Sequence, residues 1–326
     1  MTRHLRERLV HLLLVLWAVA SLTFLMFRLM PGDPTLNFVS PQFSEEMRAS
    51  LLRSFGLDKP LLQQYGIYMF NLVQGDFGVS FIQKRPVVNI LLDALPNTIV
   101  LTFTSLICAY AIGILAGAAL AFRRGSVAEA IAIPVALATR AAPEFWLGML
   151  VLAAFAFEAG WFPTGGAMSP GSPLGSVSGR LVSGDFWWHL CLPAATLTLY
   201  LQGLPLLLMR ATMLEVLNDE FITMARMKGL SRWSITMRHA ARNALLPVVT
   251  AFALGLGASI GGNVVIETVF AWPGIGRVLV EAVQSADYPL AQGAFIMIAA
   301  ALVVMNTFAD LAYAALDPRV SIGASR

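Results

Sequence analysis

Charged residues are scarce in this sequence. Asp, Glu, Lys and Arg make up 13% of its 326 residues, whereas hydrophobic residues make up 57%. A soluble globular domain carries about 25% charged residues, so the composition excludes an ordinary soluble protein and indicates one embedded in lipid. The formal net charge is only +3, and the charges lie in short segments between apolar runs. This distribution indicates membrane topology and argues against a nucleic-acid partner.

Residues and motifs that could catalyse a reaction or bind a metal are also few. The two cysteines, Cys108 and Cys191, lie in or beside apolar runs, and we expect them to pack between helices rather than form a disulfide. The four histidines lack the spacing of metal ligands. A G-x-x-x-x-G-K-[ST] phosphate loop, a G-x-S-x-G nucleophile elbow and an H-E-x-x-H zinc pair are all absent. We therefore expect a non-catalytic chain with no metal site and no bound cofactor.

Six apolar runs are long enough to cross a bilayer core, which takes about 20 residues in a helix. They are Leu9–Met30, Asn97–Phe122, Val127–Phe157, His189–Met209, Ala244–Ile266 and Leu290–Leu316. The first run follows a basic start and continues past a signal-peptide-like Ala18-Val19-Ala20, so it is predicted to be an uncleaved anchor. The sequence thus predicts an all-α integral membrane protein with six transmembrane helices.

The third run is too long for one straight helix. Its 31 residues would reach about 47 Å, whereas the bilayer core is roughly 30 Å thick. Pro143 predicts a break near Ala141, because proline removes a backbone donor and clashes with the preceding turn. Arg140 and Glu144 could pair if the helix were continuous. Two interpretations stay open: solvated charges at a helix break, or a gate or translocation path formed by Arg140, Pro143, Glu144, Phe145 and Trp146.

Lysine and arginine predict the orientation, because cytoplasmic segments carry an excess of them. With the N-terminus inside, the two short outer loops hold only Arg180 and Arg277. The inner segments hold twelve: Arg3, Arg6, Arg8, Arg123, Arg124, Arg226, Lys228, Arg232, Arg238, Arg242, Arg319 and Arg326. Both termini are therefore predicted to be cytoplasmic.

This topology divides the chain into four parts: an anchor (1–30), an outer region (31–96), a transmembrane core (97–316) and a cytoplasmic tail (317–326). The outer region is expected to contain a helix around Ser44–Phe55 and an amphipathic one over Leu61–Val73. The loop Gly160–Gly184 is rich in glycine, serine and proline and is predicted to be a flexible outer connection. Gly113 and Gly117 have the spacing that lets helices approach closely.

The inner loop Ala211–Asn243 is the most informative segment. Apolar residues recur at helical spacing from Met213 to Ala225. Gly229 then predicts a helix end, and Ser231 is a suitable N-cap for a second helix, Arg232–Arg242. The loop is thus predicted to be a charged helical hairpin. It could rest on anionic lipid headgroups, but the small Ala225 and Gly229 would also allow a partner protein to approach closely.

The loop resembles the inner-loop motif of ABC importer permeases of the dipeptide/oligopeptide/nickel branch, in Ala225-Arg226-Met227-Lys228-Gly229-Leu230 and Arg238-His239-Ala240-Ala241-Arg242-Asn243-Ala244-Leu245-Leu246-Pro247. Thr223-Met224-Ala225 replaces the general Glu-Ala-Ala, as in this branch. Further matches follow in order almost from end to end: Met30-Pro31-Gly32-Asp33-Pro34, Gly56-Leu57-Asp58-Lys59-Pro60, Gly75-Asp76-Phe77-Gly78-Val79-Ser80, Leu95-Pro96-Asn97-Thr98, Pro143-Glu144-Phe145-Trp146-Leu147-Gly148, Glu267 to Arg277, Asp287-Tyr288-Pro289 and Leu316-Asp317-Pro318-Arg319.

The resemblance implies the type I importer permease fold in the bacterial inner membrane. It implies a heterodimer with a homologous second permease, two cytoplasmic ATPase subunits that bind ATP and magnesium, and a periplasmic or lipid-anchored solute-binding protein. The chain would be the first permease of the pair. The residues that would couple it to the ATPases are Glu220, Ala225, Arg226, Lys228, Gly229, Leu230, Arg232 and Arg238.

The solute implied by the resemblance is a dipeptide or oligopeptide, with chelated nickel, glutathione or an opine-like compound as alternatives. A self-sufficient secondary transporter is a different interpretation. It predicts intramembrane ion-coordinating groups or an inverted repeat, and the sequence has neither. A membrane-bound enzyme would need clustered acids or histidines, which are also lacking.

Overall fold

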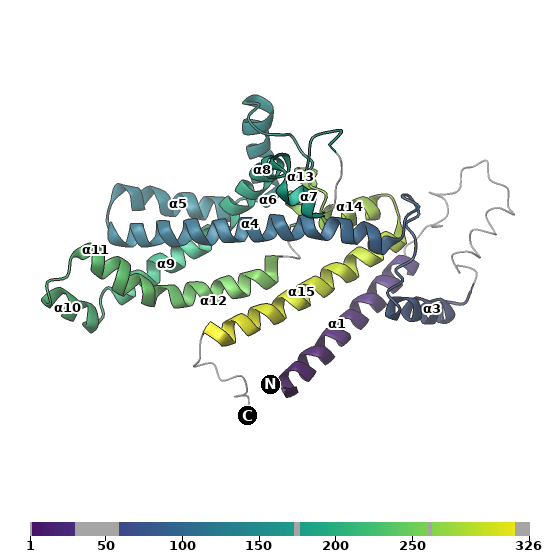
Figure 1. Cartoon of the computed structure of the whole chain (residues 1–326), viewed down its shortest axis with the longest axis horizontal. Helices are drawn as coiled ribbons and strands as arrows, with labels where there is room; N and C mark the ends of the chain where they lie inside the picture. The colour runs from purple at the N-terminus through teal and green to yellow at the C-terminus, as the bar shows by residue number, and fades with distance from the viewer. Residues whose placement is uncertain (1, 30–58, 173–176, 260–262, 317–326) are drawn as a thin grey trace. The chain divides into compact units, whose positions relative to one another are not determined.

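The computed structural model describes residues 2–29, 59–172, 177–259 and 263–316 (Figure 1). Within these ranges there is no strand, and the only strand-like pairing is an isolated bridge between Val79 and Pro86. The predicted all-α class is therefore confirmed. The helices are α1 (Thr2–Leu29), α3 (Leu61–Val73), α4 (Val87–Phe122), α5 (Val127–Ala141), α6 (Glu144–Leu152), η1 (Ala153–Glu158), α7 (Val177–Val182), α8 (Gly184–Leu201), α9 (Gly203–Val216), α10 (Glu220–Met227), α11 (Arg232–Ser234), η2 (Ile235–Ala240), α12 (Ala241–Ser259), α13 (Val264–Val269), α14 (Ile275–Gln284) and α15 (Tyr288–Leu316).

Among the described residues, three helices are long and apolar enough to cross a membrane: Val10–Arg28 within α1, the whole of α4, and Tyr288–Ala309 within α15. Two bent pairs could each form one more span. The axis turns by 107° between α5 and the α6–η1 helix, and by 42° between α8 and α9. The described residues thus support three to five spans rather than the six predicted. The fifth predicted span is divided between α12 and α13, and residues 260–262 lie outside the description.

The helix α4 begins earlier than the sequence predicted. It starts at Val87, ten residues before the expected Asn97, and Pro96 lies inside it. A helix within a bundle accommodates a proline when neighbouring groups satisfy the freed backbone. The outer helix α3 matches the predicted Leu61–Val73, whereas the predicted helix at Ser44–Phe55 lies outside the described residues.

Two compact units make up the chain: residues 1–98 with 273–304, and residues 99–272 with 305–326. The core of the first unit is formed by α4, α14 and α15, around Val87, Leu91, Ile275, Ala291 and Ala294. Within a bilayer, close van der Waals packing of such side chains is a main source of helix association.

A buried carboxylate connects distant motifs within the first unit. Asp287 is fully buried just before α15. Its carboxylate accepts hydrogen bonds from the hydroxyl of Ser80 and from the backbone N–H groups of Phe81 at 3.0 Å and Ile82 at 3.2 Å. Leu290 N donates to it as well, at 3.4 Å. The Gly75–Ser80 motif and the Asp287-Tyr288-Pro289 motif therefore meet in space, and one side chain both caps a helix and fixes a turn.

Close helix contacts organise the second unit. A Cβ atom at Gly113 would lie 2.7 Å from a Pro205 side-chain carbon, and one at Gly117 would lie 2.5 Å from the Leu206 carbonyl oxygen. The spacing of these glycines predicted a close helix approach, and the structure shows that the approaching helix is α9. Cys108 and Cys191 are free, with no disulfide, but both are exposed. The expectation that they pack between helices was wrong.

Candidate functional site

The predicted hairpin is present, with a different division into helices. The apolar stretch Met213–Ala225 was expected to be one helix, but α9 ends at Val216 and α10 begins at Glu220. Backbone hydrogen bonds from Asn218 to Glu215 and from Asp219 to Val216 form the tight turn between them. The second helix runs without interruption from α11 through η2 into α12. The short α10 therefore lies between two long helical segments (Figure 1).

Gly229 forms the bend that the sequence predicted. Its φ is +74°, in the left-handed region that favours glycine. The Gly229 N–H donates to the Arg226 carbonyl at 3.0 Å, and the Leu230 N–H donates to the Ala225 carbonyl at 3.3 Å. These two bonds form a Schellman motif, which satisfies the last carbonyls of α10. Ser231 caps the next helix as expected, accepting a bond from Ser234 N at 3.2 Å.

One face of α10 packs into the chain's own core. Ile222 and Ala225 are buried in a cluster with Met213, Ala240 and Ala244. Ala225 was expected to leave room for a partner. It instead lets α10 approach its own neighbouring helices, because a larger side chain at this position would clash with the core.

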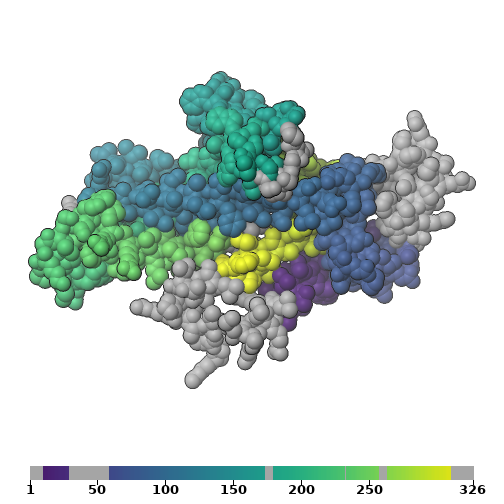
Figure 2. All heavy atoms as spheres, in the orientation of Figure 1, coloured from purple at the N-terminus to yellow at the C-terminus, as the bar shows by residue number. Residues whose placement is uncertain are grey.

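The opposite face of α10 is open. Phe221, Met224 and Met227 are spaced three residues apart, lie on one side of the helix and are exposed, Met227 by 76%. Figure 2 shows this segment, in green, at the molecular surface. Methionine is flexible and polarizable, and exposed methionines are typical of surfaces that bind other proteins.

Charged residues surround this apolar stripe. Glu220, Arg226, Lys228 and Arg238 are exposed, and Arg226 donates to the Leu217 carbonyl at 3.4 Å. Arg232 opens α11, and its side chain lies outside the description. A groove of about 460 Å³ lies beside the hairpin, lined by Ala121, Phe122, Leu217, Arg226, Leu230, Ile235 and Thr236. The hairpin thus offers an apolar stripe, a groove and exposed charges of both signs.

The second candidate site is the predicted break in the third apolar run. Since α5 ends at Ala141 and α6 begins at Glu144, the two helices do not form one continuous axis. Arg140 consequently makes no ion pair with Glu144. Its guanidinium lies 4.8 Å from the centre of the Tyr200 ring, a cation–π distance. No described group forms a hydrogen bond with Glu144 Oε1, which is a buried atom.

Two helix breaks lie next to each other at this site. A Cβ at Gly203, the first residue of α9, would lie 2.8 Å from the Ala136 carbonyl oxygen and 3.5 Å from Arg140 Cβ. The α5–α6 break therefore contacts the α8–α9 bend. Pro143, Phe145 and Trp146 are exposed in the single chain. The residues predicted to form a translocation path thus lie together at the kink between α5 and α6. The apolar side chains of Phe145 and Trp146 are solvent-exposed in the single chain.

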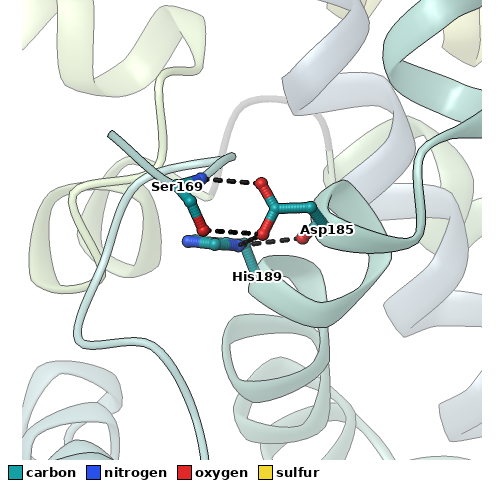
Figure 3. A network of polar contacts seen from close by, with 3 residues as sticks. All are labelled: Ser169, Asp185 and His189. Atoms are coloured by element: carbon teal, nitrogen blue, oxygen red, sulfur yellow. Dashed lines mark hydrogen bonds and ion pairs between the residues drawn. The ribbon is translucent and has the colours of Figure 1, made fainter. Parts of the chain in front are cut away.

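The side chains of Ser169, Asp185 and His189 lie close together (Figure 3). These are the three residue types of a hydrolytic triad. Asp185 accepts bonds from Ser169 N at 2.7 Å and from Ser169 Oγ at 2.8 Å. His189 Nδ1 lies 2.8 Å from the Asp185 carbonyl and 3.3 Å from its carboxylate. The serine hydroxyl bonds to the aspartate rather than to the histidine, so the arrangement needed for a nucleophile and its base is absent.

This cluster instead fixes part of a loop that was predicted to be flexible. Ser169 is tied to Asp185 at the start of α8, and Gly166 N donates to the Phe270 carbonyl at 3.0 Å. The loop Gly160–Gly184 also contains the short helix α7. The prediction of flexibility was based on composition. Composition does not reveal the hydrogen bonds that connect this loop to other parts of the chain.

Sequence reasoning missed an ion pair between α5 and α9. The Arg210 side chain donates to Glu129 Oε1 through Nε at 2.6 Å and also through Nη2, while Gly125 N donates to Glu129 Oε2 at 2.6 Å. The signal was available: Ser126 and Glu129 have capping-box spacing, and Ser126 Oγ accepts from Glu129 N. The Arg210 contact could not be predicted, because it depends on helix packing.

Two family models together match most of the chain. Residues 109–322 match the binding-protein-dependent transport system inner membrane component family, and residues 1–102 match the N-terminal membrane component model of such systems. The glutathione transport system permease protein GsiC of Escherichia coli K12 is 34% identical over 98% of this chain and 99% of the relative. GsiC of Shigella dysenteriae Sd197 matches to the same extent, and GsiC of Shigella flexneri 8401 is 33% identical. The chain belongs to the family of inner-membrane permease components of ABC importers, in the dipeptide/oligopeptide/nickel branch.

Proposed function

We propose that this chain is one of two different permease subunits of an ATP-driven importer, and that it carries a small peptide across the bacterial inner membrane by alternating access. The α10 hairpin would contact an ATPase subunit on the cytoplasmic side. Closure of two ATPases would move the hairpin and tilt the spans, as in rigid-body switching between two states. A solute-binding protein outside would deliver the solute. ATP and magnesium would be bound by the ATPases only.

The observation that carries this proposal is the two-sided character of α10. Ile222 and Ala225 join it to the core of the second unit, so a force applied to α10 reaches α9 and α12. Phe221, Met224 and Met227 remain exposed for a partner. The exposed cations Arg226, Lys228 and Arg238 would pair with acidic groups on an ATPase subunit. A lipid-bound hairpin would also expose apolar residues, so the partner must be tested directly.

The proposal is tested by a substitution at Gly229 in the complete importer, reconstituted with its binding protein. Gly229→Val forces a β-branched residue into the left-handed region and should abolish solute uptake while the chain still inserts into the membrane. Gly229→Asn, which tolerates this backbone conformation, should retain uptake. Normal uptake by the valine variant would disprove the coupling role.

The kink at Arg140 and Glu144 is proposed to line the translocation path. Charged side chains are costly within a bilayer and usually face a polar route or a partner, and these two form no ion pair with each other. Arg140→Gln and Glu144→Gln should each reduce uptake at least tenfold with no loss of assembly. Arg123→Gln, at an exposed position after α4, is the matched control. Equal uptake by all three variants would remove these residues from the path.

For the solute, we propose the peptide class. Glutathione, named for the relatives at 33–34% identity, is itself a tripeptide, so it falls within that class. A chelated nickel ion and an opine-like compound are the competing candidates. Uptake of labelled glutathione, a dipeptide and a nickel chelate by the reconstituted importer would separate them: the proposal requires transport of one of the two peptides, and transport of the chelate alone would refute it.

The same proposal includes six crossings with both termini in the cytoplasm. Labelling of single cysteines in intact cells tests it: positions near residue 3 and residue 320 should react only after the membrane is permeabilised. Reaction in intact cells at either end would overturn the orientation.

A further inference from the structure

The helix α3 has an apolar outward face, on which Gln63 is the one side chain with an amide group. It has no charged residue in its sequence LLQQYGIYMFNLV, and none of its residues is fully buried. Leu62 is 83% exposed, Phe70 66% and Val73 87%. Gln64 and Asn71 lie on the half-buried side. A helix at a water-exposed surface has the opposite pattern.

Contacts with α1 show the level at which α3 lies. The hydroxyl of Tyr65 is 2.7 Å from Ser21 Oγ, and the rings of Tyr65 and Tyr68 each lie 5.4 Å from the ring of Phe24. Ser21 and Phe24 belong to the apolar span Val10–Arg28. They precede its end at Arg28 by about 10 Å and 6 Å along the helix, at 1.5 Å per residue. The helix α3 therefore packs beside the last turns of a membrane span, not beyond them.

The surrounding residues are those expected at a membrane boundary. Tyrosine is enriched where the hydrocarbon meets the headgroups, and both tyrosines of α3 lie at this level. Arg28 ends the apolar span, and its guanidinium lies 5.4 Å from the centre of the Phe24 ring, a cation–π distance. Leu22, Leu25 and Met26 of α1 are exposed, so an apolar surface continues from α1 to α3.

We infer that α3 is an interfacial helix, which lies in the boundary layer of the bilayer with Leu62, Phe70 and Val73 inserted among the acyl chains. Its 13 residues span about 20 Å, which is too short to cross the roughly 30 Å core. Amphipathic helices of this kind bind in the plane of the membrane through their apolar face. The occupant of the outward face is thus lipid. The helix holds the segment that follows it at a fixed height above the membrane.

Spin labels test this inference in the full chain, assembled in its importer and reconstituted in phosphatidylcholine–phosphatidylglycerol vesicles. Cys108 and Cys191 are first replaced by alanine, and single cysteines are placed at Leu62, Phe70 and Val73. Leu25→Cys on α1 is the lipid reference and Lys59→Cys, before α3, is the water reference. All five positions are exposed, so each label should be tolerated without unfolding.

The expected result is that the three α3 labels collide with oxygen several-fold more often than with a water-soluble nickel complex, as the Leu25 label does. A preference for the nickel complex, as at Lys59, would show that water covers the face. Poor access to both reagents would show that another subunit or the binding protein covers it. Either result would overturn the inference, and the three positions provide independent readings.

Discussion

Three bends in this chain share one backbone geometry and differ in the residue that forms it. After α10 the left-handed position is Gly229, after α13 it is Ala271 with φ +49°, and after α14 it is Ala286 with φ +54°. All three helices end in the same pair of backbone hydrogen bonds. Alanine in this region costs roughly 1–2 kcal/mol, yet two of the three bends accept it.

Packing around the bends explains why two of them have alanine and the third has glycine. The residue after Ala271 is Trp272, which is fully buried among Phe186, Phe270 and Leu190, and the residue after Ala286 is the buried Asp287 with its four donors. At these two bends the surroundings impose the conformation. At Gly229 a Cβ would find no atom within 4 Å, so no packed side chain imposes the bend. Glycine's tolerance of left-handed angles and the two backbone hydrogen bonds maintain it.

The largest effect is expected when the packing at Ala271 is removed. Trp272→Ala should lower the free energy of unfolding by about 3–5 kcal/mol, because a buried aromatic side chain leaves a cavity. Trp233→Ala, at an exposed position, is the control and should cost less than 1 kcal/mol. Thermal unfolding of the two variants in detergent makes the comparison. Similar losses for both would contradict the packing explanation.

Removing the carboxylate beside Ala286 should have the next largest effect. Asp287→Ala leaves the hydroxyl of Ser80 and the N–H groups of Phe81 and Ile82 without this acceptor, and an unsatisfied buried donor costs about 1–3 kcal/mol. We expect a loss of about 3 kcal/mol in the free energy of unfolding. The matched variant Asp93→Ala breaks a surface pair with Arg85 and should cost at most about 1 kcal/mol. The Asp287 clamp is refuted if the two variants unfold alike.

The exposed bend should respond locally. Gly229→Ala should raise the energy of α10 by about 1–2 kcal/mol with almost no change in global unfolding, because no packed side chain is displaced. Hydrogen exchange of the α10 amides should then become about 5- to 30-fold faster, while amides of α13 and α14 are unchanged. Unchanged exchange in α10 would mean that contacts with the core, not the glycine, hold the bend.

The reverse substitution should have the smallest effect. Ala271→Gly removes the left-handed strain, which stabilises the folded chain. It also increases the conformational entropy of the unfolded chain, which destabilises the folded chain by about 0.4–1 kcal/mol. The net change in the free energy of unfolding should be below about 1 kcal/mol, measured by the same thermal method. A loss above 2 kcal/mol would show that the methyl group of Ala271 is itself part of the packing.

The same contrast explains what the sequence could predict. Gly229 and Ser231 are local signals, so the bend and the following cap were predicted correctly. The break at Ala141–Pro143 was also predicted, from proline and from length. The left-handed alanines were not, since nothing in Ala271 or Ala286 indicates a bend without knowledge of the buried Trp272 and Asp287. The burial of Ala225 was missed for the same reason: helical spacing shows a face but not what covers it.

Contact between α10 and an ATPase subunit is the central claim, and site-directed photocrosslinking tests it most directly. A benzoylphenylalanine is placed at Met227, the most exposed apolar position of α10, in the assembled importer. Gln83, exposed in the first unit, carries the same group as a control. We expect a crosslink to an ATPase subunit from position 227 and none from position 83. Crosslinks from position 227 to lipid or to the other permease alone would contradict it.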